Sequence, residues 1–152
     1  MSEIYLGNPN LKKANTPIQF SAEQIEEFLK CKNNPVYFAQ KYVKIVSLDE
    51  GLVPFQPYKF QEKLIKRFHK NRFNICKMPR QTGKSTTVVS YLLHYAVFND
   101  SVNIGILANK AATARELLGR LQTAYENLPK WMQQGVLVWN RGSLELENGS
   151  KI

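Results

Sequence analysis

Residues 78–85 read MPRQTGKS, and this stretch decides how the sequence around it is interpreted. It follows the short β-prone segment FNICK at 73–77 and precedes a mostly apolar segment, 84–98, whose length and composition are typical of a buried helix. A tight turn between a strand and a helix points successive backbone N–H groups at one spot, beside the positive end of the helix dipole. The arrangement predicts a binding site for phosphate.

The end of this stretch carries the residue types that a nucleoside triphosphate needs. In the pattern GxxxxGK[ST], Gly83 gives the backbone freedom, Lys84 bridges the β- and γ-phosphates, and Ser85 ligates Mg²⁺. We therefore predict a P-loop for ATP and Mg²⁺, here called the phosphate loop (78–85). The alternative is a polar helix cap without a ligand. The predicted contacts are Pro79, Arg80, Gln81, Thr82, Gly83, Lys84, Ser85 and Thr86.

Two positions depart from the usual pattern. Met78 stands where the first glycine is expected, and Arg80 places a guanidinium inside the loop. A cation at that point can offset the charge that develops during phosphoryl transfer, so Arg80 is a candidate arginine finger. The alternative is a side chain that faces solvent or pairs with an acidic residue. Lys84 and Arg80 are the predicted catalytic residues.

The segments that follow the loop predict the fold class. A second buried strand is expected at 102–108 and a second helix at 111–128. Strand, helix, strand, helix predicts an α/β fold, a P-loop NTPase of the ASCE or RecA-like type with a parallel sheet and flanking helices. The sheet is expected to be incomplete at the C-terminus, and the turn signals in 136–152 predict a short β-meander.

The N-terminal third predicts three further parts. Residues 1–20 indicate an extended arm, and 21–50 a helical segment in which Ser21 caps a helix at 22–32 and a second helical face runs over 36–46. Residues 51–152 form the first half of the predicted ATPase domain. After a connector at 48–57, an amphipathic helix with a basic outer face is expected to run to about residue 70.

Composition limits the class of protein. The chain has 152 residues, two cysteines and a net charge of +9, with no apolar run of membrane-spanning length. We expect one soluble, intracellular domain without a membrane partner. The charge suits a polyanion such as nucleic acid, although many basic domains bind none.

The combination of motifs resembles one family. PRQTGKS at 79–85, preceded by QPYKFQ at 56–61 and followed by GILANKAATARELLGRLQTAYENLP, resembles the large terminase subunit of tailed phages, especially the T-even type. The similarity extends over nearly all of the chain, and that family also has a P-loop with its first glycine replaced and an arginine ahead of Gln-x-Gly-Lys.

The resemblance implies ATP hydrolysis that drives double-stranded viral DNA into a procapsid. It implies contacts with the portal protein and the small terminase subunit, a pentameric motor, and the host cytoplasm as location. A glutamine motif that contacts adenine matches Gln56 and Gln61, of which Gln61 is favoured. The alternative is that either side chain only faces solvent.

The same resemblance shows what is missing. In the family, a later strand ends in an Asp-Glu pair that supports Mg²⁺ and activates water, and a nuclease domain follows. Asp49 and Glu50 do not fit that pair, because only Val46 and Ser47 precede Leu48. We expect an N-terminal fragment with little ATPase activity of its own, and a second chain that supplies the missing half in trans is one option. Two other interpretations stay open: a stand-alone nucleotide- or nucleic-acid-binding module, and a fragment of a superfamily 2 helicase-type ATPase.

Overall fold

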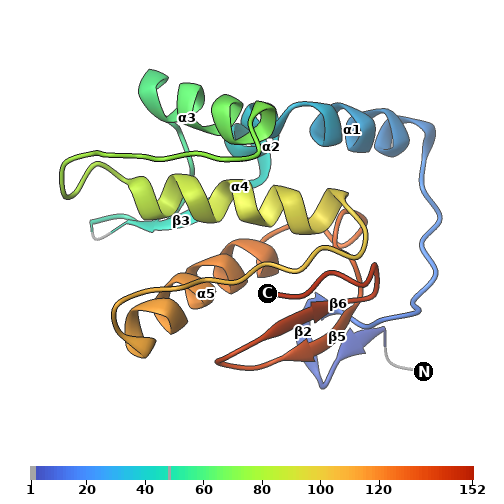
Figure 1. Cartoon of the computed structure of the whole chain (residues 1–152). Helices are drawn as coiled ribbons and strands as arrows, with labels where there is room; N and C mark the ends of the chain where they lie inside the picture. Colours follow the sequence, from blue (N-terminus) through green and yellow to red (C-terminus); the bar gives the residue numbers. More distant parts are fainter. Residues whose placement is uncertain (1–2, 48) are drawn as a thin grey trace.

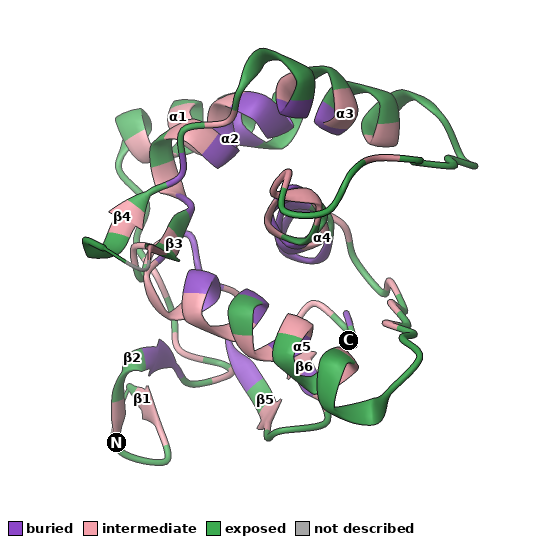
Figure 2. Cartoon of the chain, turned by 90° about the vertical axis from the view of Figure 1, so that its left-hand side faces the viewer, coloured by how far each residue is buried: buried purple, intermediate pink, exposed green. Residues whose placement is uncertain are grey.

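A central helix organises the chain in the computed structural model, which describes residues 3–47 and 49–152. This helix, α4 (Lys84–Phe98), packs against α2 and α3 on one side and α5 on the other (Figure 2). The remaining helices are α1 (Ala22–Asn33), α2 (Pro35–Tyr42), α3 (Lys59–Lys70) and α5 (Ala111–Glu126). The strands are β1 (Ile4–Tyr5), β2 (Asn8–Lys12), β3 (Lys44–Ser47), β4 (Gly51–Pro54), β5 (Val136–Trp139) and β6 (Leu144–Leu146).

The predicted parallel sheet is wrong. The strands of the described residues form three separate antiparallel pairs, β1 with β2, β3 with β4, and β5 with β6. Residues 73–77 form no strand, and of the predicted strand 102–108 only Asn103 makes a bridge, parallel to Lys151. The two segments run on opposite sides of α4 (Figure 1), so neither provides the other with a hydrogen-bonded neighbour. A β-prone sequence becomes a strand only where such a neighbour exists.

The N-terminal arm is more structured than its composition indicates. β1 and β2 pair as a hairpin, and Lys13 adds a parallel bridge to Val136 at the start of β5. Leu11 is fully buried because this hairpin lies against β5 and the turn before it (Figure 1). Predictions from local sequence missed this contact because it joins segments more than 120 residues apart.

The second predicted helical face ends early. α2 stops at Tyr42, and Lys44–Ser47 then pairs in register with Gly51–Pro54, from Lys44 opposite Pro54 to Ser47 opposite Gly51. The β-branched residues Val43, Ile45 and Val46 favour an extended backbone over a helix. The predicted connector therefore supplies the second strand of a hairpin.

Helix starts follow the local sequence closely. Ser21 accepts a hydrogen bond from the backbone N–H of Gln24, whose side chain accepts one from the N–H of Ser21, which is the predicted capping box. Asn34 caps α2 in the same way by accepting from the N–H of Tyr37, and Pro35 occupies the first helical position. These bonds satisfy backbone donors that a helix cannot satisfy itself.

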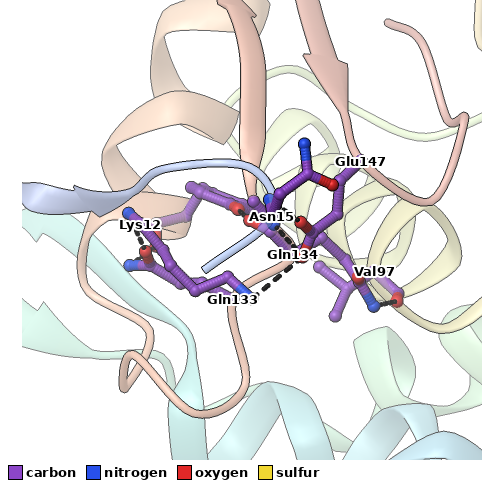
Figure 3. A network of polar contacts seen from close by, with 8 residues as sticks. Lys12, Asn15, Val97, Gln133, Gln134 and Glu147 are labelled. Atoms are coloured by element: carbon purple, nitrogen blue, oxygen red, sulfur yellow. Dashed lines mark hydrogen bonds and ion pairs between the residues drawn. The ribbon is translucent and has the colours of Figure 1, made fainter. Parts of the chain in front are cut away.

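A polar network ties the two ends of the chain together beside the apolar core (Figure 3). The Glu147 carboxylate accepts hydrogen bonds from Lys12 Nζ (2.9 Å) and from the backbone N–H groups of Gly135 (2.7 Å) and Asn15 (2.8 Å). Burial opposes the negative charge, but these donors together hold the pKa of Glu147 below its usual value. The buried amide of Gln133 links the same region to the backbone of Lys12 (3.0 Å).

Candidate functional site: the phosphate loop

The N-terminus of α4 is left open to a ligand. Gly83 is its N-cap residue and adopts a left-handed conformation, with φ 69°, that suits glycine. No side chain caps this end and no acidic residue lies in the first turn. The N–H groups of residues 84–86 therefore have no hydrogen-bond partner within the described residues. Such a set of free donors at the positive end of a 15-residue helix favours an anion.

Lys84 lies folded over the loop. Its ammonium group donates hydrogen bonds to the carbonyl oxygens of Met78 (3.3 Å) and Pro79. The hydroxyl of Thr82 donates to the same Pro79 carbonyl (3.1 Å). Lys84 is the first residue of the helix whose N–H groups are free. A phosphate group bound at this helix terminus would compete with the two neutral carbonyls for the Lys84 ammonium group. Charge-assisted bonds to phosphate are the stronger of the two kinds.

Gln61 connects α3 to the loop. Its side-chain carbonyl accepts from the backbone N–H of Tyr58 (2.8 Å), and its amide nitrogen donates to the carbonyl of Thr82 (3.3 Å). The residue is 3% exposed. A Cβ atom at Gly83 would lie 2.5 Å from that amide nitrogen, so the glycine also allows this close approach. The structure therefore gives the Gln61 side chain a positioning role on the loop.

Gln56 has the opposite environment. It is exposed and its amide has no hydrogen-bond partner within residues 3–47 and 49–152. A free amide carries the paired donor and acceptor that an adenine edge requires. Of the two predicted adenine contacts, Gln61 already uses its amide within the fold, whereas the amide of Gln56 remains open to a ligand.

A cavity of about 570 Å³ joins these residues. The stacked rings of Tyr58 and Phe60, 5.8 Å apart and inclined by 10°, lie on its wall. Sequence reasoning missed this aromatic pair, although its position beside Gln56 was a usable signal. Of the predicted contacts, the lining includes Gln56, Gln61, Gln81, Thr82, Gly83 and Thr86, while Pro79, Arg80, Lys84 and Ser85 lie outside it.

Arg80 and Ser85 are both exposed, and neither side chain is paired in the part of the chain that the structure describes. The Ser85 hydroxyl, in the first turn of α4, fits a role as one ligand of a phosphate-bound Mg²⁺. Mg²⁺ typically takes few protein ligands and completes its shell with phosphate and water. The described residues contain no group of three or more His, Cys, Asp or Glu side chains that could hold a metal without the phosphates.

A scan of the chain against models of known protein families finds no match. No helix among residues 3–47 and 49–152 is both long and apolar enough to cross a membrane.

Proposed function

We propose that this chain is the ATP-binding part of a phage large terminase subunit, which in complete form hydrolyses ATP to move viral DNA into a procapsid. The observation that carries the proposal is the loop itself: free N–H groups at residues 84–86, the left-handed Gly83 and the folded Lys84 lie together. These are the three features that phosphate binding at a helix terminus requires. The portal protein, the small terminase subunit and the host cytoplasm belong to this proposal through the sequence resemblance.

Within the proposal, each residue has a separate task. Lys84 exchanges its carbonyl partners for the β- and γ-phosphates, and Ser85 contributes its hydroxyl to Mg²⁺. The base occupies the cavity beside Tyr58 and Phe60, where Gln56 reads the adenine edge. Arg80 is free to reach the γ-phosphate because nothing in the described residues holds its guanidinium.

Hydrolysis by this chain alone should be weak. Neither the phosphate loop nor the lining of the cavity contains an Asp or Glu, so neither supplies a base that would activate water. Loss of general-base assistance typically lowers a rate by about 10²–10⁴-fold. The same observation favours a second candidate function, a module that binds a nucleotide without hydrolysing it.

Nucleotide binding tests the proposal directly. Titration of a fluorescent ATP analogue with Mg²⁺ should give saturable binding that Lys84→Ala weakens by at least about tenfold, because a charged hydrogen bond is worth about 1.5–3 kcal/mol. Lys110→Ala is the matched control, since Lys110 is the N-cap residue of α5, which also lacks a side-chain cap but has no left-handed glycine. Equal binding by the wild type and Lys84→Ala would exclude the loop as the site.

A further inference from the structure

The positive charge of the chain is concentrated in one segment. Residues 59–84 contain nine Lys and Arg side chains and a single acidic one, Glu62, and so hold eight of the nine net positive charges. The rest of the molecule is nearly neutral. The Glu62 carboxylate accepts a hydrogen bond from the Gln40 amide (3.0 Å), and no salt bridge among the described residues involves this segment. No carboxylate within the described residues therefore neutralises a cation of this segment.

Four of these cations form a straight line along α3. Lys59, Lys63, Lys66 and Lys70 recur at steps of four, three and four residues, which places them on one face of the helix, and all four are exposed. We call this set the basic stripe. It spans about 16 Å at 1.5 Å per residue. The opposite face of α3 carries the buried Gln61 and Ile65, and α3 packs against α2 and α4.

Repulsion within the basic stripe offsets part of the stability of α3. Lys59 with Lys63 and Lys66 with Lys70 are like charges one turn apart, and each such pair destabilises a helix by about 0.2–0.5 kcal/mol. Lys59 and Lys63 also lie toward the N-terminus, where the helix dipole disfavours cations. Glu62, four residues before Lys66, offsets part of this repulsion, and Lys70 lies in the last turn, where the helix dipole favours a cation. No salt bridge among the described residues neutralises the four lysines, which points to an external anion.

We propose that the basic stripe of α3 binds the phosphate backbone of duplex DNA without sequence preference. Duplex DNA presents one negative charge per about 1.7 Å of its axis, so a 16 Å stripe faces a continuous row of charges rather than one phosphate. Lysine binds phosphate as a point charge, and contacts to phosphates position a protein on DNA without reading its sequence. Single-strand binders instead interleave aromatic platforms with cations. Here one stacked pair, Tyr58 and Phe60, flanks Lys59, and no aromatic residue shares the helix face of the other three lysines.

This surface is separate from the nucleotide site. Its four lysines do not line the cavity beside the loop, and Lys84 lies outside the stripe. DNA binding by α3 depends on the charge and geometry of this helix and does not require that the loop bind ATP.

Duplex binding as a function of salt tests the stripe. Fluorescence anisotropy with a mixed-sequence duplex of about 25 base pairs should show affinity falling with salt at a log–log slope of about −4, because each phosphate contact contributes about −0.9. Replacing all four lysines by Gln should weaken binding about 100-fold at low salt and remove most of the slope. The matched control replaces Lys13, Lys32, Lys44 and Lys110 by Gln, four exposed lysines without an ion pair in the described chain, and should change affinity by less than about threefold.

Three other results would overturn the proposal that the basic stripe binds duplex DNA. An equal loss in both fourfold variants would show that net charge alone binds DNA and would overturn the assignment to α3, as would unchanged binding by the stripe variant. Stripe-dependent binding that is tighter for a single strand of the same length would overturn the choice of duplex. If the stripe variant fails to fold by circular dichroism, Lys66→Gln alone must reduce the slope by about 0.9. Lys84→Ala should bind the duplex normally even if it loses ATP, so the two proposals fail separately.

Discussion

The two ends of α4 differ in how their backbone groups are satisfied. At the C-terminal end, Asn148 Nδ2 donates to the carbonyl of Ala96 (2.9 Å), Gln134 Nε2 donates to that of Val97 (3.0 Å), and Ser150 Oγ donates to that of Asn99 (2.9 Å). At the N-terminal end, the N–H groups of residues 84–86 have no such partner among the described residues. One end is closed by distant side chains and the other is left open.

The two ends of α4 also differ in the burial of their side chains. Leu93, Ala96, Val97 and Phe98 are buried, whereas in the first turn Ser85 is exposed and Lys84 and Thr86 are half-buried. Interactions that stabilise the fold gather where α4 meets the α1–α2 pair and the 134–150 segment, and interactions that could serve a ligand gather at the loop. α4 can keep unsatisfied N–H donors at its N-terminus because the buried side chains and hydrogen bonds at its C-terminal end hold the helix in place. Substitutions at the two ends should therefore have very different effects on stability.

Phe98→Ala should have the largest effect. The Phe98 ring meets Phe28, Phe38 and His94 with centroids 4.8, 5.3 and 4.9 Å apart, so its removal leaves a cavity in the aromatic core. The free energy of unfolding should fall by about 3–5 kcal/mol, measured by urea denaturation. A loss below about 1 kcal/mol would contradict the view that this end fixes the helix.

Lowering the pH should weaken the same end through His94. Burial of the imidazole lowers its pKa from 6.5 to about 4, although the hydrogen bond between Nε2 and the Cys31 carbonyl (2.9 Å) favours the proton. The stability due to the neutral ring is complete above pH 6.5 and is lost as the pH falls toward 4, by about 3 kcal/mol in all at 1.36 kcal/mol per pKa unit.

The control for this titration is His94→Leu, in which the pH dependence between 6.5 and 4.5 should largely vanish. Glu27 and Glu147 also have lowered pKa values, but their effect on stability begins only when the pH falls below their ordinary pKa of 4.5. Thermal melts of both proteins across this range measure the difference. Parallel curves for wild type and variant would show that His94 is not the titrating group.

Asn148→Ala should have a smaller effect at the closed end. The amide donates to the carbonyls of Ala96 and Asn99 (3.0 Å) and accepts from the N–H of Ser150 (3.1 Å). Leaving these groups unsatisfied should cost about 1–3 kcal/mol in chemical denaturation. Asn127→Ala, which removes only the bond to the Thr123 carbonyl one turn back in α5, should cost less. If Asn148→Ala and Asn127→Ala lowered the free energy of unfolding equally, a cap from a distant residue would contribute no more than a cap from within the helix.

Changes at the open end should have the smallest effect on folding. Lys84→Ala and Ser85→Ala, melted without nucleotide, should each stay within about 0.5 kcal/mol of the wild type because neither side chain is buried. Destabilisation by more than about 1 kcal/mol would mean that the hydrogen bonds of Lys84 to the Met78 and Pro79 carbonyls hold the fold together. The loop would then be a structural cap.

Local patterns predicted most of the helices. The capping box at Ser21, the apolar stripe of the helix that ends at Lys70, and the start of a helix at Lys84 all agree with the structure. The hairpin over 136–147 is also present as β5 and β6. Each of these features depends only on residues within a few positions of one another, so the sequence alone contains all the information that predicts it.

Local patterns did not predict pairing between distant segments. The sequence at 73–77 is β-prone, yet Ile75 is fully exposed because no described strand lies beside it. Motif spacing likewise could not distinguish the roles of Gln56 and Gln61. The difference between them arises because the Gln61 amide donates to the carbonyl of Thr82 (3.3 Å), a residue 21 positions further along the chain.

The sequence by itself determined where helices begin, the glycine and lysine of the phosphate loop, and the run of lysines along α3. These follow from backbone freedom, side-chain length and helical period, all of which act over one or two turns. Only the tertiary structure decided that the chain forms three antiparallel pairs and that Gln61 is committed to the loop. It also decided that the arm meets β5 through the bridge between Lys13 and Val136, while Lys12 binds Glu147. Those outcomes depend on contacts between residues tens of positions apart, whose free energy is gained only when the whole chain is packed.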